Sequence, residues 1–529
     1  MMQEKRFQVY LPIVFAAIFL GGIVVGYGLR NRVGGSSFFS GNKGSSLQEI
    51  SNLIKSKYVD EVGIDSINAF AADEMLSHLD PHSVYIPPSE LARVTDQMEG
   101  HFTGVGILYD MIDDTLNIMR LIKNGPAEKA GVMVGDKLIK INDSINVVGK
   151  KINDELLRKN MKGPEGSVIN ISLLRDGVEK KIEIKRAQIA IPSIDASYVI
   201  ENKTGYIRIN KFAERTYEEF MQSLEALQKQ KIENLIIDLR GNGGGYMHAA
   251  TAIADEFLDG DKLIVYTQGN KSEKNEFRCR KEGLFEKGKL VVLLDETSAS
   301  ASEVLAGALQ DWDRATIVGR RSFGKGLVQQ QFNLSDGGAL RLTVARYYTP
   351  LGRNIQKPYT QGKKKYMQEL EERYHSGGMQ KEDSSQQQGA AFKTPKGNTV
   401  YGGGGITPDY FIAFDTTKLQ SIYGKLYYKD VLEKFAYKYC VANKQLLNTY
   451  KTSNDIKTKF SLTENDWKLL QTLAAKDSID ISNINVDDKQ KVLGKTKALA
   501  ARQIISNAAY YEINNTDDNI VKKALEIIK

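Results

Sequence analysis

Cysteine and histidine are scarce in this chain of 529 residues, which contains two cysteines and five histidines. Cys279 and Cys440 lie far apart, and neither has another cysteine or a histidine at metal-ligand spacing. The sequence therefore predicts no metal site, and nothing in it indicates a disulfide. No glycine-rich run is followed by the Lys-Ser or Lys-Thr pair of a phosphate loop, and we expect no cofactor.

A concentrated basic surface is also lacking, although the formal net charge is +7. The 72 Lys and Arg residues are spread along the chain and form no stripe interleaved with aromatic residues. This pattern indicates a solvated surface and predicts no nucleic-acid partner. The composition, 41% hydrophobic and 26% charged, is that of a globular protein, and the length favours two to four domains.

One long uncharged run is present near the N-terminus, where Lys5 and Arg6 precede the 21 apolar or small residues from Val9 to Leu29. At helical rise this run is long enough to cross the hydrocarbon core of a bilayer, and it is longer than the apolar part of most signal peptides. We expect residues 1–30 to form an uncleaved anchor, with a cleaved signal sequence as the alternative. The catalytic part is then expected outside the cytoplasm, as a periplasmic protein held at the inner membrane.

The rest of the chain divides into regions of different pattern. They are a Gly- and Ser-rich flexible tether at 31–46, a helical region at 47–100, short alternating strands at 101–190, a mixed α/β core at 191–415 that includes a polar insertion at 357–404, and a Lys-rich helical region at 416–529. The core contains short, fully apolar strands at 235–239 and 290–294, which are typical of a sheet covered on both faces. We expect the polar insertion to be a mobile surface segment.

A strand, a turn and a helical pattern surround Ser300. This arrangement places a hydroxyl at the positive end of a helix, where backbone N–H groups can stabilise a developing anion. The segment Ser300-Ala-Ser-Glu303 also fits a capping box, in which serine and glutamate only satisfy free N–H groups of the helix. The segment alone does not decide between a nucleophile and a helix cap.

Two glycine-containing segments complete the candidate site. Lys325 stands between two glycines in the run Ser322-Phe-Gly-Lys-Gly, and a lysine that loses its charge through burial can serve as the base for a serine. By itself this run is more typical of a surface turn. Three glycines end the run Asp238-Leu-Arg-Gly-Asn-Gly-Gly-Gly245, and their backbone N–H groups suit an oxyanion hole.

Taken together, these segments resemble the carboxy-terminal processing peptidases (tail-specific proteases, peptidase family S41). The same family order continues through other motifs between about residues 47 and 412, which are LDPHSVY at 79–85, FTGVGI at 102–107, GPAEKAG at 125–131, TVARYYTPLG at 343–352 and GITPD at 405–409. The resemblance implies an α/β fold, with a ClpP/crotonase-like peptidase core, an inserted mostly-β PDZ domain and flanking helical regions. It also implies a serine endopeptidase.

The resemblance assigns the catalytic roles by position. Ser300 stands 25 positions before Lys325, so that Ser300, rather than Ser298 or Ser302, matches the family's nucleophile. Lys325 matches the general base, and Gln329, four residues later, matches the residue that orients the lysine.

The supporting roles are implied in the same way. Glu303 matches an acidic residue with a supporting or capping role, and whether Gln329 or Glu303 is the third catalytic residue stays open. The oxyanion hole is implied at the backbone N–H of Ala301 and of a glycine in the loop, with Gly245 preferred to Gly244.

The resemblance also implies how substrates are recognised. A PDZ groove takes an extended C-terminus as an added strand, and Val105, Gly106 and Ile107 are the candidates for holding its carboxylate. We therefore expect polypeptides with free C-termini as substrates, and a PDZ domain that gates the active site. An inactive PDZ-bearing scaffold of the cell envelope and a crotonase-like acyl-CoA enzyme are the alternatives; a Ser–His pair with His248 is disfavoured because no G-x-S-x-G elbow is present. Whether the chain forms a homo-oligomer is left open.

Overall fold

The structure is a computed structural model that describes residues 16, 18–22, 46–149, 154–375, 377–381 and 389–529. The chain divides into two compact units, residues 1–72 and 73–529, and each is described by itself. The predicted anchor at Val9–Leu29 lies mostly outside the described residues, as does the predicted tether up to residue 45. Among the residues that are described, no helix is long and apolar enough to cross a membrane.

The first unit contains α2 (Ser46–Lys57) and the start of α3 (Ile64–Ser77). Both helices were expected from the apolar periodicity of this segment. Ser51 Oγ donates to Asn68 Oδ1 at 2.9 Å and joins the two helices. No residue of α2 is buried, and its apolar residues Leu47, Ile50 and Leu53 are exposed.

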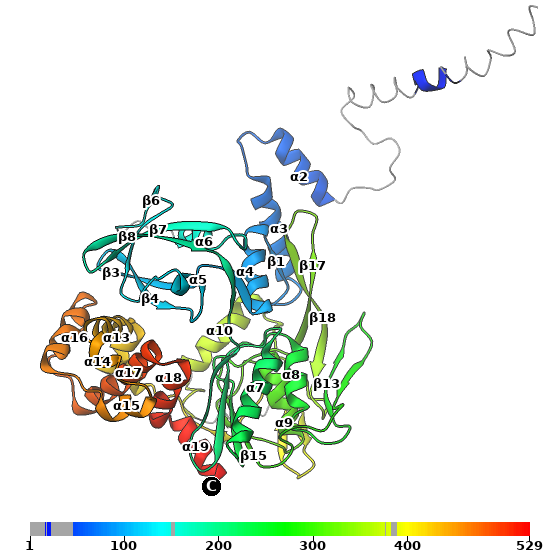
Figure 1. The fold of residues 1–529 in the computed structure, drawn as a ribbon. Coiled ribbons are helices and arrows are strands. Elements are labelled where there is room, and N and C mark those ends of the chain that lie inside the picture. Colours follow the sequence, from blue (N-terminus) through cyan, green and yellow to red (C-terminus); the bar gives the residue numbers. More distant parts are fainter. Residues whose placement is uncertain (1–15, 17, 23–45, 150–153, 376, 382–388) are drawn as a thin grey trace, which may run out of the picture. The chain divides into compact units, whose positions relative to one another are not determined.

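The PDZ region (residues 101–190) is an antiparallel sheet of strand order β3-β4-β5-β7-β8, in which β6 pairs with β5 (Figure 1). Its elements are β3 (Ile107–Ile112), β4 (Thr115–Leu121), α5 (Pro126–Lys129), β5 (Lys137–Ile141), β6 (Ile145–Asn146), α6 (Asp154–Met161), β7 (Val168–Arg175) and β8 (Val178–Lys185). A turn at Asp176-Gly177 joins β7 and β8, and both residues have positive φ. A separate pair, β2 (His101–Gly104) and β9 (Ala187–Ala190), closes the region at its two ends. Strand β3 is therefore an edge strand of the main sheet.

The peptidase core is built on a six-stranded sheet that carries the site. Its strands, in spatial order, are β10 (Ile194–Val199), β11 (Thr204–Ile209), β12 (Asn234–Asp238), β15 (Lys289–Leu294), β16 (Thr316–Gly319) and β21 (Tyr410–Phe411). All neighbouring strands from β11 onward are parallel, and β10 is antiparallel to β11. The carboxyl ends of β12 and β15 lead into the glycine loop and the Ser300 turn, so these two segments meet at one edge of the sheet.

Both faces of this sheet are buried, as the apolar strands predict. Leu235 and Ile237 pack with α7 (Thr216–Lys229), α8 (Met247–Ala254) and α9 (Ala301–Asp311), whereas Ile236 packs on the opposite face with α19 (Asn519–Ile528). Because side chains alternate along a strand, only a sheet covered on both sides makes consecutive residues of β12 apolar. The last helix of the chain thus belongs to the core of the peptidase, although its sequence lies in the Lys-rich C-terminal region.

A second, antiparallel sheet stands beside the core and carries the lysine side of the site. It has the strand order β1 (Val84–Ile86), β18 (Ala339–Tyr348), β13 (Leu263–Gln268) and β14 (Asn275–Arg278), with β17 (Leu327–Asn333) also paired to β18. Helix α4 (Pro88–Glu99) directly follows β1.

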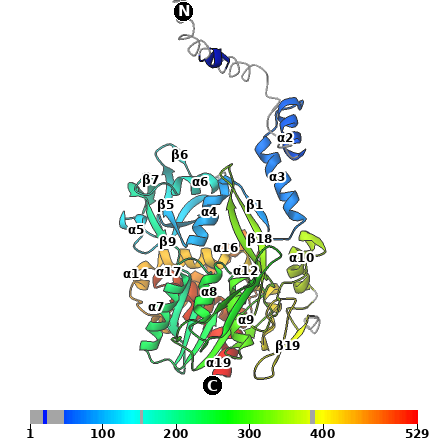
Figure 2. The same cartoon turned by 90° about the vertical axis from the view of Figure 1, so that its right-hand side faces the viewer.

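The polar segment 357–404 was expected to be a mobile surface segment, and much of it forms regular elements. It contains α10 (Gly362–His375), β19 (Ala391–Lys393) and β20 (Thr399–Tyr401), and Figure 2 shows α10 and β19 along one side of the peptidase core. Tyr366 and Arg373 of α10 are buried. Polar composition does not reveal this burial, because Arg373 is buried as an ion pair with Glu369 rather than by apolar contact. Residues 376 and 382–388 lie outside the described part.

The C-terminal region is helical, as predicted. It contains α11 (Thr417–Gln420), α12 (Ile422–Tyr428), α13 (Val431–Ala442), α14 (Lys444–Leu447), α15 (Ser453–Lys459), α16 (Glu464–Lys476), α17 (Val486–Ile504), α18 (Asn507–Asn514), the 3₁₀ turn Asn515–Asp517 and α19. Helices α13 and α16 lie beside the PDZ strands β3 and β4 (Figure 1), where Lys438 of α13 and Lys476 of α16 both form ion pairs with Asp113. Cys279 and Cys440 are free and buried.

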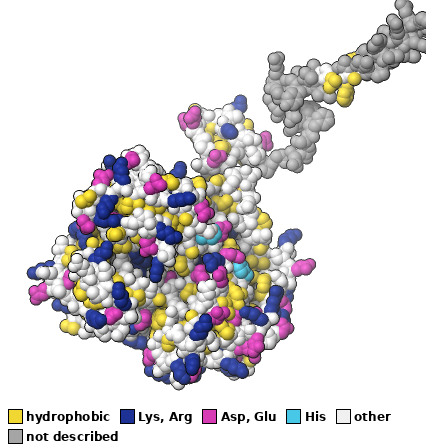
Figure 3. All heavy atoms as spheres, viewed as in Figure 1, with side chains coloured by type: hydrophobic (Ala, Val, Ile, Leu, Met, Phe, Trp, Pro, Cys, Tyr) yellow, Lys and Arg dark blue, Asp and Glu magenta, His cyan; other side chains and the backbone are white. Residues whose placement is uncertain are grey.

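Basic and acidic side chains are mixed on the visible surface, as the sequence indicated. Figure 3 shows basic and acidic side chains interspersed over the visible face of the described residues, without a large field of one sign. The excess of positive charge is therefore dispersed on this face.

Candidate active site

Ser300 stands at the turn between β15 and α9 with an unusual backbone conformation. Its φ is 57° and its ψ is −115°, whereas helix-capping residues normally adopt the β region. A positive φ is strained for a residue with a side chain, and such strain is concentrated at functional sites. The capping box is present, but capping alone does not require this conformation.

The Glu303 carboxylate joins the serine turn to the lysine turn. Glu303 is completely buried, and one oxygen, Oε2, accepts hydrogen bonds from the backbone N–H of Ser300 at 2.8 Å and of Lys325 at 2.9 Å. The other oxygen, Oε1, accepts from Ser322 Oγ and from the N–H of Gly324. Burial raises the pKa of Glu303, while these four donors favour its ionised form. A single side chain therefore fixes both candidate catalytic residues through their backbones.

Tyr347 forms a second link between the same two turns. Its hydroxyl donates to the carbonyl of Lys325 at 2.5 Å and lies 3.3 Å from the carbonyl of Ser300. The side chain comes from β18 and is almost fully buried, and burial raises its pKa well above the ordinary value. The tyrosine therefore stays neutral and keeps the proton that it donates. Sequence reasoning quoted the motif that contains Tyr347 but gave this residue no role.

Lys325 lies in an environment that favours the neutral amine. Burial is the largest cause and the positive charge of Arg341 the next, and together they lower its pKa from 10.5 to about 8, against the opposing charges of Glu303 and Asp80. Its Nζ donates to Gln329 Oε1 at 2.8 Å. A β-bulge between Val328 and Gln329 interrupts the register of β17 at this point.

Gln329 is itself held in one orientation. Its Nε2 donates to the backbone carbonyl of His82, so that Oε1 is the atom turned to Lys325. The turn that contains His82 is fixed by Asp80, whose Oδ1 accepts from the N–H of His82 at 2.8 Å. The predicted orienting residue is thus in place, and the LDPHS motif supplies its support.

The structure brings Ser300 and Lys325 to one place but does not join their side chains. Among the described residues, no hydrogen bond connects Ser300 Oγ with Lys325 Nζ. Catalytic hydrogen bonds are often long in substrate-free enzymes and tighten when substrate binds.

The glycine loop lies directly against the serine turn. A Cβ placed on Gly244 would stand 2.8 Å from Ser300 Cβ and 2.9 Å from the nitrogen of Ala301, so only glycine fits here. The N–H of Gly244 donates to Asn242 Oδ1 at 2.9 Å, which removes it as an oxyanion donor. The N–H groups of Gly245 and Ala301 have no acceptor within the described residues. Of the two predicted glycines, the geometry therefore favours Gly245.

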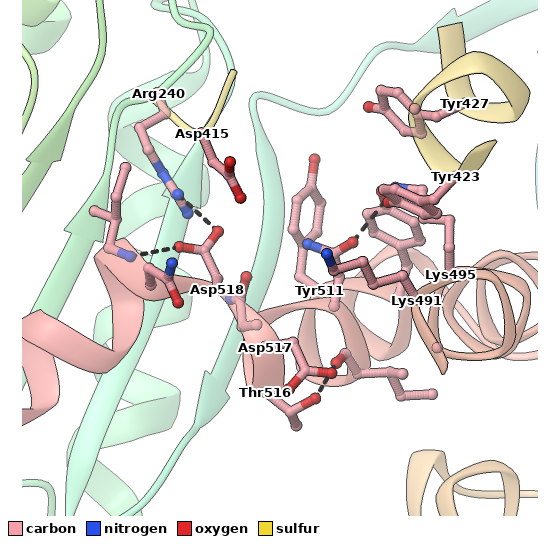
Figure 4. Close-up of a pocket in the computed structure, with 18 of the residues that line it drawn as sticks. Arg240, Asp415, Tyr423, Tyr427, Lys491, Lys495, Tyr511, Thr516, Asp517 and Asp518 are labelled. Atoms are coloured by element: carbon pink, nitrogen blue, oxygen red, sulfur yellow. Dashed lines mark hydrogen bonds and ion pairs between the residues drawn. The ribbon is translucent and has the colours of Figure 1, made fainter. Parts of the chain in front are cut away.

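Charged residues support the glycine loop from behind. Asp295 accepts from the N–H of Gly241, and Arg240 forms ion pairs with Asp238 at 2.6 Å and with Asp518 at 2.8 Å. Arg240 and Asp295 also line a cavity of about 1090 Å³. Figure 4 shows Arg240 and Asp518 on one wall of this cavity and Tyr423, Tyr427, Lys491 and Lys495 on the other. The rear of the loop is thus set by contacts between the peptidase core and the C-terminal helices.

The predicted carboxylate loop lies at one end of a groove on the PDZ region. The groove has a volume of about 660 Å³ and runs along the edge strand β3, opposite residues of α6. It is lined by Phe102, Val105, Gly106, Ile107, Leu108, Tyr109, Asp110, Met111, Leu116, Arg158, Met161 and Lys162. The carbonyls of Val105 and Gly106 accept from Ala127 and Ile122, whereas the N–H groups of both residues have no acceptor within the described part of the chain.

The histidines take no part in the serine chemistry of this arrangement. His248 is exposed, stacks on Tyr246 and lies 3.7 Å from Glu214. His82 is satisfied by the hydroxyl of Tyr366 at 2.7 Å, and burial lowers its pKa to about 4. His248 thus has no contact with Ser300 among the described residues.

Comparisons with known proteins identify the family of the chain. The model of "Peptidase family S41" matches residues 203–363, and a "Family of unknown function (DUF8443)" matches residues 422–506. The chain is 36% identical over 313 residues to a carboxy-terminal-processing protease of Bartonella bacilliformis, covering 58% of this chain and 71% of that protein. It is also 36% identical over 318 residues to the carboxy-terminal processing protease CtpB of Bacillus subtilis, covering 59% and 65%.

Solved structures are also similar to this chain. A photosystem II D1 C-terminal processing protease is 28% identical, with a TM-score of 0.35, over 60% of this chain and 85% of that one. The PDZ domain of the carboxy-terminal protease of Vibrio cholerae, in complex with a peptide, is 28% identical, with a TM-score of 0.16, over 17% of this chain and 97% of that one. On the strength of its sequence relatives, the chain belongs to peptidase family S41, the carboxy-terminal processing serine proteases.

Proposed function

We propose that this chain is an endopeptidase with a Ser300–Lys325 dyad, and that it cleaves polypeptides whose free C-termini are captured in the PDZ groove. The observation that carries the proposal is the single buried Glu303 oxygen that accepts from the backbone of both residues. Capping of α9 requires only the hydrogen bond from the N–H of Ser300. The second hydrogen bond, from the N–H of Lys325, is not needed for a cap.

The chemistry follows from the donors around each atom. The neutral amine of Lys325 donates one N–H to Gln329 Oε1, which leaves its lone pair to accept the proton of the Ser300 hydroxyl. Ser300 Oγ then attacks the substrate carbonyl carbon, and the N–H groups of Ala301 and Gly245 stabilise the oxyanion. The protonated lysine returns its proton to the leaving amine. Water next attacks the acyl-enzyme, with Lys325 again as the base, and releases the new C-terminus.

Capture of the substrate tail uses a different surface. Because β3 is an edge strand, an extended peptide can pair with it as an added strand. Its terminal carboxylate then reaches the N–H groups of Val105, Gly106 and Ile107. We further propose that this binding gates the site by bringing Ser300 and Lys325 into hydrogen-bonding distance.

A cleavage assay tests the dyad. The full-length chain is incubated with an unstructured protein, and wild type is compared with the Ser300→Ala, Lys325→Ala and Ser302→Ala variants. The control removes a hydroxyl two residues away that donates to the carbonyl of Asn242. We expect the first two variants to lose cleavage and the control to retain it. Cleavage by Ser300→Ala would show that the nucleophile is wrong, and a wild type that cleaves nothing would favour the inactive scaffold.

A substrate series tests the gate. The same unstructured protein is prepared with different terminal residues, and its cleavage rate is measured for each. Rates that do not depend on the terminal residues would contradict tail capture without affecting the assignment of the dyad.

We also propose that Val9–Leu29 anchors the chain in the inner membrane, with the catalytic part in the periplasm. The support is the length of the uncharged run alone. N-terminal sequencing of the mature protein after membrane fractionation tests this: a chain that begins beyond residue 30, or that leaves the membrane fraction in a salt wash, would contradict the anchor.

A further inference from the structure

One cationic side chain stands beside the carboxylate loop of the PDZ groove. Lys162 directly follows α6, and it forms an isolated antiparallel bridge with Gly104, the residue before Val105. It lines the same groove as Val105, Gly106 and Ile107. Its ammonium group also lies 5.2 Å from the ring centre of Phe102, another residue of the groove. Lys162 is thus placed at the end of the groove that would hold a terminal carboxylate.

This ammonium group forms an ion pair with a carboxylate of the chain itself. Lys162 Nζ lies 2.6 Å from Asp96 Oδ2, and Asp96 belongs to α4, outside the PDZ region. The two side chains are 42% and 26% exposed, so water screens the pair and its exchange for another carboxylate costs little. The groove itself carries one acidic residue, Asp110, whose Oδ1 accepts from the N–H of Met111.

We infer that the ammonium group of Lys162 binds the terminal carboxylate of a captured tail. The tail carboxylate then displaces the carboxylate of Asp96 from Lys162. The inference rests on the proposed capture of tails in this groove. Backbone N–H groups supply directed hydrogen bonds but no net charge, whereas a charge-assisted bond to lysine is stronger and is specific for a carboxylate. Arg158 is the other cationic residue of the groove. It lies one turn before Lys162, on α6, and is therefore farther in sequence from the residue that bridges to Gly104.

The helix that carries Asp96 also contacts the segment that supports the glycine loop. Helix α4 is tied to the peptidase core by the carbonyl of Met98, which accepts from the N–H of Glu214 at 3.2 Å. Two residues before Glu214, the N–H of Phe212 donates to the carbonyl of Gly244 at 3.0 Å. The contact between Lys162 and Asp96 thus links the PDZ groove to a helix that is hydrogen-bonded near the glycine loop.

Peptide binding tests the inference with the full-length chain, in a Ser300→Ala background so that the peptide stays intact. The probe is a fluorescent, unstructured decapeptide ending in leucine, prepared as the free acid and as the C-terminal amide, with fluorescence anisotropy as the readout. Leucine is chosen because Val105, Ile107, Leu116 and Met161 give the groove apolar walls.

We expect the free acid to bind about tenfold or more tightly than the amide, and Lys162→Gln to weaken the free acid about tenfold while leaving the amide unchanged. Asp96→Asn, which removes the internal competitor, is expected to strengthen binding of the free acid. The matched control is Lys181→Gln, which removes a 2.8 Å ion pair with Asp143. Lys181 is on β8, at the opposite edge of the sheet from β3, and we expect its substitution to change neither affinity.

The possible failures are distinguishable. If the parent chain binds acid and amide equally, tail capture in this groove is wrong and the inference falls with it. If the parent distinguishes them and Lys162→Gln distinguishes them equally well, tail capture stands and the role of Lys162 is wrong. If Asp96→Asn weakens binding of the free acid, the exchange is wrong, because Asp96 then supports the groove instead of competing for it.

Discussion

The pH dependence of cleavage should report the protonation of Lys325. Only the neutral amine can accept the proton of Ser300, and the pKa of Lys325 is lowered to about 8 by burial and by Arg341. At pH 7, about one lysine in ten is then neutral, compared with about three in ten thousand at the ordinary pKa of 10.5. The lowered pKa of this side chain therefore increases the active fraction about 300-fold at neutral pH.

The assay is kcat/KM for a fluorogenic peptide between pH 6 and about 10, because this quantity reports the free enzyme. We expect the rate to rise about tenfold per pH unit below the midpoint and to level off above a midpoint near pH 8. The sign follows from the base: deprotonation creates the active form, so activity is gained as pH rises and lost as it falls. A flat profile, or a midpoint near the ordinary pKa of lysine, would refute Lys325 as a desolvated general base.

Substitution of Arg341 tests the cause of this lowered pKa. The positive charge of Arg341 disfavours the ammonium form of Lys325, so Arg341→Gln should raise the pKa and move the midpoint to higher pH without changing the plateau. The matched control is Arg346→Gln, on the same strand, since its guanidinium bonds the hydroxyl of Tyr359 and is not among the charges that act on Lys325. Equal shifts in both variants would mean that general surface charge, rather than the local field of Arg341, sets the midpoint.

Three further substitutions test the packing of the site. Gly244→Ala should abolish most of kcat because its Cβ would collide with Ser300, whereas Gly243→Ala meets nothing within 4 Å and should be near wild type; equal activities of the two would contradict the close approach. Tyr347→Phe should cost about 1 kcal/mol in a denaturant titration and lower kcat more than it changes KM; an unchanged kcat would show that the hydroxyl only stabilises the fold. Glu303→Gln keeps the size of the side chain but turns an NH₂ group toward backbone donors, and should cost about 3 kcal/mol and most of the activity; a stable, fully active variant would contradict its linking role.

Much of the fold could be predicted because its signals are local. The apolar runs at 235–239 and 290–294 indicated strands buried on both faces, and β12 and β15 have that position. The last helix could not be placed from its sequence, because an amphipathic pattern shows that a face is buried but not what covers it. In the structure, α19 returns from the C-terminal region to cover the second face of the peptidase sheet.

Some residues of the candidate site could be predicted from the sequence, whereas the roles of others depend on contacts between distant segments. Ser300 and Lys325 were candidates from their local sequence, and the family resemblance selected them by their spacing and added Gln329. Tyr347 was missed because its role depends on two carbonyl groups that come from separate turns. The choice between Gly244 and Gly245 also needed the structure, since it depends on a hydrogen bond to Asn242. Residues that hold the reacting groups through the backbone leave little pattern in a single sequence.

Helix capping and catalysis, which the sequence presented as competing explanations of Ser300 and Glu303, are compatible in this structure. Glu303 does satisfy the N–H of the capping position, but the same carboxylate also accepts from the lysine turn. The cap therefore fixes the position of Ser300 relative to Lys325 in addition to completing α9. The strained φ of Ser300 is retained because this carboxylate, Tyr347 and the close approach of Gly244 hold the turn from three sides. A serine that only capped a helix would need none of these contacts, so together they support the assignment of Ser300 as the nucleophile more strongly than the spacing of the motif does.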